Sequence, residues 1–169
     1  DSAMYIESFL STVIDTDKCD LTRLATTTES ELAKVLENSY RAMNIAFMVE
    51  WSRFAEEANA NLYSIVDAIR VRDSHSNMMY PGIGVGGYCL TKDPLLASWA
   101  RQEYFKSPAK LRMSEEGVST NDQMPYFALA RIERVAKGLQ GKNVGVMGVS
   151  YRGDVGDTRF TPVLNFVRG

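Results

Sequence analysis

The chain has few of the residues that mark several specialised classes of protein. Two cysteines and one histidine among 169 residues are too few for a disulfide framework and make a structural zinc site improbable. No uninterrupted apolar run reaches the roughly 18 residues that span a membrane. The N-terminal residues also lack the basic-then-apolar order of a signal peptide. These absences favour a reducing, cytoplasmic setting, with neither a metal site nor a membrane span.

No sign of charge predominates either. Nineteen Lys and Arg residues oppose 21 Asp and Glu residues, which gives a net charge of −2 at pH 7. This balance argues against a broad nucleic-acid-binding surface but leaves room for a local anion pocket. Hydrophobic residues make up 45% of the chain and charged residues 24%. Both values are typical of a globular protein, and the length suits one domain or at most two.

Apolar periodicity predicts a mainly α-helical chain with one long helix. From Thr28 to about Asn59 there is neither proline nor glycine, which predicts a helix of roughly 30 residues and about 45 Å. Thr28 and Glu31 fit the T-x-x-E pattern of a capping box. A helix of this length favours a spine or a homodimer interface. The apolar stripe that we expect to pack consists of Leu32, Val35, Leu36, Met43, Phe47, Phe54 and Ala55.

Shorter elements are expected on both sides of this helix. The pattern predicts helices at 3–14, 61–69, 95–104 and 124–139, the last ended by Gly141. Residues 143–149 are apolar and rich in valine, which predicts a buried parallel strand. Thr161 and Pro162 are expected to start a further helix. Because a buried strand needs neighbours on both sides, we expect the chain to be part of a longer protein.

Residues 82–87 match the G-x-G-x-x-G fingerprint of dinucleotide-binding proteins. That fingerprint requires a strand before it and a long helix after it. Here Pro81 directly precedes the glycines, and Pro94 is expected to interrupt the following helix. We therefore reject dinucleotide binding by this segment. Four glycines in six residues instead favour either a tight surface loop or a backbone that approaches a ligand closely.

The residues after the glycines carry reactive groups. Cys89, Lys92 and Asp93 place a thiol, an ammonium and a carboxylate within five residues, which indicates a candidate nucleophile site. The simpler alternative is a small, buried hydrophobic cysteine. A redox-active thiol protein is disfavoured, because there is no C-x-x-C motif and Cys19 lies 70 residues away.

Three segments together carry a resemblance to a known family. They are SELAKVLENSYRAMNIAFMVE, PGIGVGGYCLTKDP and GKNVGVMGVSYRGDVGDTR. They resemble the long central helix, the active-site loop and the start of the C-terminal domain of nucleotide-sugar 6-dehydrogenases. The resemblance implies the tail of an NAD-binding domain at 1–27 and a helical central dimerisation domain, with a spine helix, at 28–140. It further implies the first strand of a C-terminal, nucleotide-sugar-binding α/β domain at 141–169.

The resemblance also implies the catalytic residues. Cys89 would attack the C6 aldehyde, forming a thiohemiacetal that is oxidised to a thioester. Lys34 and Asn38 would hold the reacting oxygen. Asp93 would position or deprotonate the hydrolytic water; its alternative role is to cap a helix that starts at Pro94. Lys92 receives no role.

Ligand-binding residues follow from the same resemblance. The loop glycines and Arg152 would contact the nucleotide sugar, and Arg159 would lie near the phosphates of NAD, which is bound mainly by a domain outside this chain. The motif favours a UDP-sugar, with a GDP-mannose-specific enzyme as the alternative. A second alternative is a dimerisation domain that is not catalytic by itself. The implied loop glycines are Gly82, Gly84, Gly86 and Gly87.

Overall fold

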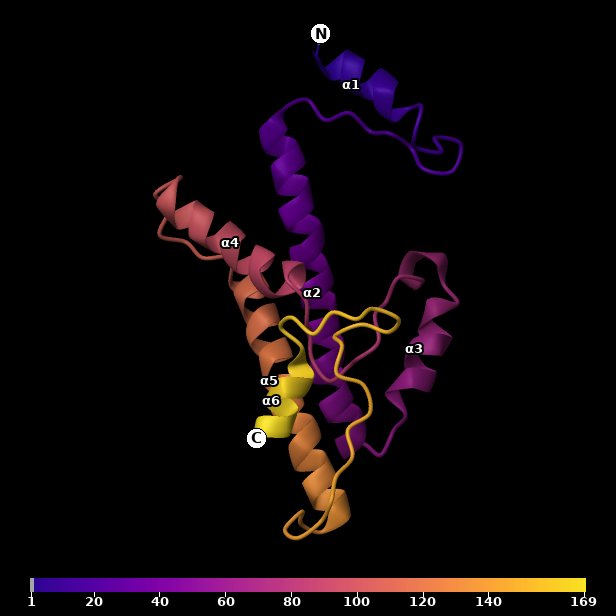
Figure 1. The fold of residues 1–169 in the computed structure, drawn as a ribbon, viewed down its shortest axis with the longest axis vertical. Helices are drawn as coiled ribbons and strands as arrows, with labels where there is room; N and C mark the ends of the chain where they lie inside the picture. The colour runs from indigo at the N-terminus through magenta and orange to yellow at the C-terminus, as the bar shows by residue number, and fades with distance from the viewer. Residues whose placement is uncertain (1) are drawn as a thin grey trace. The chain divides into compact units, whose positions relative to one another are not determined.

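The computed structural model describes residues 2–169, and every regular element in this part of the chain is a helix. It confirms the prediction of a mainly helical chain (Figure 1). The chain divides into two compact units, with the boundary between residues 34 and 35. No helix in the described part is long and apolar enough to cross a membrane. The elements are α1 (Ser2–Leu10), α2 (Thr27–Glu57), α3 (Leu62–Arg70), the 3₁₀ turn η1 (Asp73–His75), α4 (Cys89–Glu103), α5 (Arg112–Ala136) and α6 (Pro162–Arg168).

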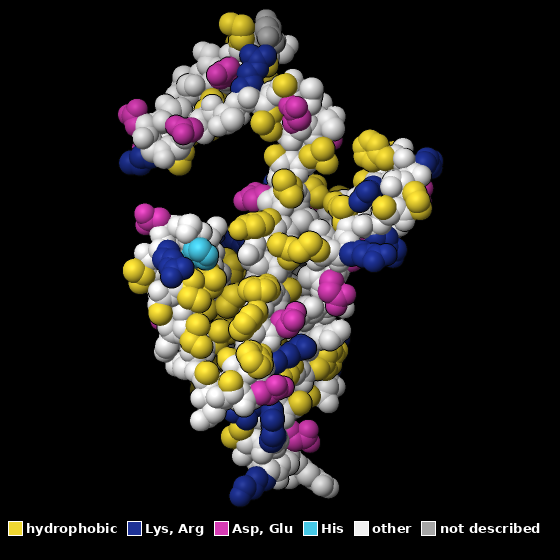
Figure 2. All heavy atoms as spheres, turned by 180° about the vertical axis from the view of Figure 1, so that it is seen from behind, with side chains coloured by type: hydrophobic (Ala, Val, Ile, Leu, Met, Phe, Trp, Pro, Cys, Tyr) yellow, Lys and Arg dark blue, Asp and Glu magenta, His cyan; other side chains and the backbone are white. Residues whose placement is uncertain are grey.

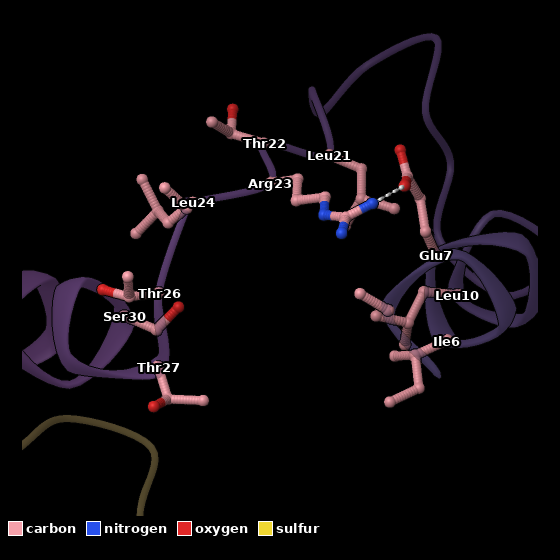
Figure 3. A pocket seen from close by; sticks show the side chains of 12 residues that line it. Ile6, Glu7, Leu10, Leu21, Thr22, Arg23, Leu24, Thr26, Thr27 and Ser30 are labelled. Carbon is pink, nitrogen blue, oxygen red and sulfur yellow. Dashed lines mark ion pairs between the residues drawn. The ribbon is translucent and has the colours of Figure 1, made fainter. Parts of the chain in front are cut away.

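The first unit contains α1, a stretch of turns at residues 11–19, a segment without regular structure and the first residues of α2. Helix α1 ends at Leu10, four residues before the predicted end. None of residues 2–34 is buried. A pocket of about 310 Å³ lies between α1 and residues 21–30 (Figure 3). Arg23 and Glu7 form an ion pair of 4.0 Å there. The predicted site residues do not line this pocket.

Helix α2 begins with a capping box that differs from the predicted one. The backbone N–H of Glu29 donates to Thr26 Oγ1 at 3.1 Å, and the N–H of Thr26 donates to Glu29 Oε2 at 2.9 Å. This reciprocal pair satisfies two N–H groups at the helix start. The assignment of the box to Thr28 and Glu31 was therefore wrong by two residues, although the long helix itself is confirmed.

The buried face of α2 is not the predicted stripe. Leu36, Phe47 and Phe54 are exposed, whereas the buried face carries mostly small side chains. Small side chains let helices approach closely: a Cβ on Gly117 of α5 would lie 3.2 Å from the Cα of Met43. The expected packing of the stripe was therefore wrong for Leu32, Leu36, Phe47 and Phe54, which are exposed. It holds for Ala55, which is buried, and for Met43, which meets Gly117. The buried residues of α2 are Asn38, Ser39, Ala42, Ala46, Met48, Val49 and Ala55.

Two helices start earlier than predicted, because each continues through a proline. Helix α4 contains Pro94 and α5 contains Pro125, and both rings are fully buried. An interior proline removes a hydrogen bond and costs about 3 kcal/mol, which packing of the buried helix outweighs. The expectation that Pro94 interrupts or starts a helix was wrong, and so Asp93 does not cap one. Gly141 does not end α5 either, since Ala136 does, with Lys137 in the left-handed region at φ 55°.

Residues 143–149 do not form the predicted strand. They are exposed and without regular structure, and Met147 is 99% exposed. A buried parallel strand requires hydrogen-bonded neighbours on its edges, and the described chain contains none. Helix α6 begins as predicted: the Thr161 side chain accepts a hydrogen bond from the N–H of Val163, and Pro162 follows the cap.

A small hydrophobic core fixes the start of the glycine-rich segment. In the larger unit, α5 packs against both α4 and α6. Met78 and Met79, just before the glycines, pack against a cluster from α2 and α3. The chain that leads into the loop is therefore held by its apolar side chains. The cluster consists of Met48, Ala55, Leu62 and Val66.

Candidate active site

The glycine-rich loop, residues 81–88, lies against the segment 151–162 of the same chain. The N–H of Gly87 donates to the carbonyl of Arg159 at 3.2 Å. A Cβ on Gly86 would overlap Tyr151 and come within 2.8 Å of the Phe160 carbonyl oxygen. This close approach accounts for glycine at that position without a ligand. Gly84 and Gly87 also have positive φ angles, 129° and 80°.

We expect Gly86→Ala to destabilise the larger unit while Gly82→Ala does not. The added methyl at 86 must displace Tyr151 and the backbone of Phe160, at a cost of about 1–3 kcal/mol. At Gly82 the nearest atom to a new Cβ would be 3.9 Å away. Urea unfolding of both variants measures the difference. Equal stability of the two would contradict this account of the loop.

Cys89 is the first residue of α4 and follows the loop directly. Its side chain is exposed and forms no disulfide. The alternative of a buried structural cysteine is therefore wrong. Asp93 lies four residues later, which places both side chains on one face of α4. Asp93 is only 6% exposed. The loop and the first turns of α4 thus present an accessible thiol beside a buried carboxylate.

Asn38 and Asp93 join helices α2 and α4. Asn38 Nδ2 donates to Asp93 Oδ2 at 2.6 Å, and Asn38 is 7% exposed. Buried polar groups need partners of this kind, because an unpaired carboxylate would lose its hydration without compensation. The structure therefore brings together two of the predicted catalytic residues from positions 55 residues apart in the chain.

Lys92 also holds the Asp93 carboxylate, a contact that the sequence did not predict. Lys92 Nζ donates to Asp93 Oδ1 at 2.5 Å and lies 4.9 Å from the centroid of the Tyr88 ring. The hydrogen bond to Asp93 is the main cause that raises the pKa of Lys92 above its usual value. Adjacent side chains on a helix do not normally face each other. The spacing of the two residues therefore did not predict this contact. The long, flexible side chain of Lys92 makes it possible, because it can reach the carboxylate of its neighbour.

Lys34 lies in α2, four residues before Asn38, and is the last residue of the first unit. Its side chain is exposed. The i, i+4 spacing puts Lys34 and Asn38 on one face of the helix. The role of Lys34 stays a prediction.

The two predicted arginines lie in the segment that follows residues 143–149. Arg152 is exposed. Arg159 binds Asp157 through two guanidinium nitrogens, with Nη2 at 2.6 Å from Oδ2. These hydrogen bonds lower the pKa of Asp157 to about 2. Because the folded-state pKa is lowered, the pairing stabilises the fold above the usual carboxyl pKa. That contribution is lost as the pH falls towards 2.

A pocket of about 480 Å³ adjoins Lys92. Its walls come from α4, α5, α6 and the residues just before α6. Pockets of this size accept small organic ligands. The described residues contain no group of three or more His, Cys, Asp or Glu side chains placed to hold a metal ion. The lining residues include Tyr88, Thr91, Lys92, Asn121, Asn165 and Arg168.

Residues 28–123, more than half of the chain, match the central domain of the UDP-glucose/GDP-mannose dehydrogenase family. The chain belongs to this family. The resemblance inferred from the sequence is thereby confirmed at the level of the family. The match contains Lys34, Asn38, Cys89 and Asp93, although it does not test their roles.

Individual relatives within the UDP-glucose/GDP-mannose dehydrogenase family agree with this assignment. A UDP-N-acetyl-D-mannosamine dehydrogenase from Methanocaldococcus jannaschii is 38% identical over 140 residues, covering 82% of this chain and 30% of the relative. A solved UDP-N-acetyl-mannosamine dehydrogenase from Pyrococcus horikoshii is 31% identical, with a TM-score of 0.68 over 83% of this chain and 33% of that one. A solved UDP-glucose dehydrogenase from Pyrobaculum islandicum has a TM-score of 0.76 at 26% identity, covering 96% and 38%. The chain therefore spans about a third of the length of these relatives.

Proposed function

We propose that this chain is the central part of an NAD-dependent nucleotide-sugar 6-dehydrogenase that oxidises the primary alcohol of a UDP-sugar to the uronic acid. The proposal is carried by the Asn38–Asp93 hydrogen bond, which joins two of the expected catalytic residues; Asp93 is buried and lies one helical turn from the exposed Cys89 on α4. The names of the relatives favour an N-acetylated UDP-hexosamine as the substrate class. A GDP-mannose-specific enzyme is the alternative substrate assignment.

Cys89 would supply the covalent step. Oxidation of the C6 alcohol yields an aldehyde, to which the sulfur adds as a thiohemiacetal. A second oxidation converts this adduct into a thioester, and hydrolysis then releases the acid. A thiolate suits both steps because it attacks a carbonyl and also leaves readily. NAD would accept the hydride in each oxidation.

Asp93 would act in the hydrolysis of the thioester. Asn38 and Lys92 each donate to one of its oxygens, which favours the ionised carboxylate and fixes its orientation. Asp93 can therefore orient the attacking water and accept its proton. Asn38 and Lys34 would hold the reacting oxygen while negative charge develops on it.

The remaining residues would bind the nucleotide sugar and the cofactor. We assign the backbone of Gly82, Gly84, Gly86 and Gly87 and the cation of Arg152 to the sugar nucleotide. Arg159 is assigned to the phosphates of NAD, because its guanidinium side chain is 74% exposed and suits a phosphate. The glycines do not form a phosphate cradle, since Tyr151 and Pro162 lie where side chains at three of them would point.

The domain assignment rests on the family match, which begins at residue 28, and on the resemblance of residues 141–159 to the start of the C-terminal domain. We assign residues 1–27 to the tail of the NAD-binding domain, 28–140 to the central domain and 141–169 to the start of the nucleotide-sugar-binding domain. The exposed, unpaired segment 143–149 suits a strand whose neighbours lie in the rest of that domain. By itself the chain would be a dimerisation domain without activity.

The function is tested with the full-length protein that carries this sequence. Incubation with NAD and a panel of UDP- and GDP-sugars should give two NADH for each uronic acid formed, with UDP-N-acetylhexosamines turned over fastest. The chain of 169 residues should form no NADH. Failure of the full-length protein to oxidise any nucleotide sugar, or turnover by the isolated chain, would contradict the proposal.

We also expect a homodimer through the exposed side of α2. Phe47, Trp51 and Phe54 recur at helical spacing, with ring centroids 6.0 and 5.8 Å apart, and all three are exposed. Figure 2 shows hydrophobic side chains gathered over one face of the larger unit. Such a patch marks an interaction surface.

Sedimentation of the native chain should give a dimer at micromolar concentration. Trp51→Glu should give a monomer, while Val71→Glu, at an exposed position outside the stripe, should stay dimeric. A monomeric native chain would contradict this.

A further inference from the structure

Tyr80, the last residue before the glycine-rich loop, lies in a cluster of side chains from α3. Its ring stacks on that of Tyr63, with centroids 5.7 Å apart and an interplanar angle of 20°. The guanidinium carbon of Arg70 lies 4.9 Å from the centroid of the Tyr80 ring. The Tyr80 hydroxyl donates a short hydrogen bond to Asp67 Oδ1. We call Tyr63, Asp67, Arg70 and Tyr80 the α3 clamp.

The clamp also holds backbone on both sides of Tyr80. Arg70 Nε donates to the carbonyl of Ser76 at 3.0 Å, and the Tyr63 hydroxyl donates to the carbonyl of Pro81 at 3.4 Å. The three α3 residues stand at i, i+4 and i+7, which is one face of a helix. One helical face thus fixes the chain from residue 76 to residue 81, immediately before the first loop glycine.

Hydrophobic packing does not explain the clamp. Tyr63 is 54% exposed and Tyr80 38%, whereas α3 is anchored in the core by Leu62 and Val66. The far end of the loop is held separately, by the hydrogen bond from Gly87 to Arg159. Between these two ends lies Gly82, where a Cβ would meet nothing nearer than 3.9 Å and where glycine gives the chain its greatest conformational freedom; Gly84 lies against Pro162 and Asn121. Without the clamp, Met78 and Met79 alone would hold the entry to the loop, and the conformational freedom left at residues 80–82 would be lost only when the ligand binds.

We propose that the α3 clamp is a positioning device that holds the glycine-rich loop in the conformation that accepts the nucleotide sugar. The inference rests on the proposed function, because it takes the loop as the sugar-nucleotide site. When the loop is already ordered, binding of the ligand does not include the entropic cost of ordering it. The clamp acts on substrate binding and leaves the chemistry at Cys89 unchanged. Its members are positioning residues and not catalytic ones.

Three variants of the full-length protein test the clamp. Tyr80→Leu removes the ring and the hydroxyl, Tyr80→Phe removes only the hydroxyl, and Tyr104→Leu makes the same change at an exposed tyrosine in neither the clamp nor the loop. We expect Tyr80→Leu to raise KM for the nucleotide sugar about 10-fold with kcat within about twofold. The reason is that the loop then becomes ordered only when the ligand binds, which lowers the affinity. Tyr80→Phe should raise KM about two- to fivefold, because the ring stack remains. Tyr104→Leu should change neither constant.

Hydrogen exchange of the loop amides gives a second, independent measurement. Exchange at residues 82–86 should accelerate in Tyr80→Leu and stay at the native rate in Tyr104→Leu. Unchanged exchange in Tyr80→Leu overturns the clamp, whatever the kinetics show. Faster exchange with an unchanged KM, or a fall in kcat at constant KM, overturns its role in substrate binding while the proposed function stands. Absence of nucleotide-sugar oxidation by the native protein overturns the proposed function, and exchange then still decides whether the clamp orders the loop.

Discussion

Cys89→Ser is expected to abolish acid formation by the full-length protein, lowering the rate by about 10³-fold or more. A serine hydroxyl is a far weaker nucleophile than a thiolate at neutral pH. The described residues offer no histidine to activate it, since His75, the only histidine of the chain, lies in η1 before the loop. Reaction should stop at or before the aldehyde. Acid and NADH are measured with a UDP-sugar and NAD.

The matched control is Cys19→Ser. Cys19 is the other free cysteine and is also exposed, so the same change is made at a thiol outside the proposed site. We expect this variant to form acid at the native rate. Near-normal acid formation by Cys89→Ser would refute the assignment of the nucleophile, and equal losses in both variants would point to a general effect of removing thiols.

Asp93→Asn is expected to slow hydrolysis of the thioester by about 10²–10⁴-fold, the usual contribution of a positioned general base. Asparagine keeps the shape of the side chain and can still accept from Asn38. It cannot take a proton from water, and it removes the anionic partner of Lys92. The covalent sugar thioester should therefore accumulate on Cys89. Intact-protein mass spectrometry after mixing with NAD and substrate detects the adduct.

Asp20→Asn, at an exposed position, is the control for this change and should show no adduct. Rapid acid release by Asp93→Asn without an adduct would contradict a role for this carboxylate in hydrolysis. Loss of the first oxidation as well would indicate that Asp93 acts earlier, for example by orienting Asn38. The first NADH burst distinguishes these two results.

The prolines show where local rules failed and why. The sequence analysis expected Pro94 to interrupt or start a helix, because an isolated helix tends to break at proline, and it placed the start of the next helix at residue 124, beside Pro125. In the folded chain both rings are fully buried inside α4 and α5. The free energy of packing exceeds that of one lost hydrogen bond, but it depends on partners that a local pattern does not contain. Cys89 therefore lies at the start of a helix and not in a loop before one.

Helix α2 shows a second limit. Its length followed from an uninterrupted pattern without proline or glycine, but its buried face did not follow from the large apolar residues. Of those residues, Leu32, Leu36, Phe47 and Phe54 are exposed, whereas Met43 makes the close contact with Gly117 of α5. Periodicity reports which residues share a face, and it does not distinguish a face that packs within the chain from one that meets another molecule.

The sequence by itself determined the helical class, the long helix α2, the cysteine after the glycine-rich loop and the family. These features depend on composition and on order along the chain. Only the tertiary structure decided that Asn38 and Lys92 both donate hydrogen bonds to the carboxylate of Asp93. It alone also decided that residues of α3 contact Tyr80. Such contacts join residues that are distant in sequence, or neighbours that a helix normally keeps apart. Their geometry is set by how the helices pack, and that is a property of the whole fold.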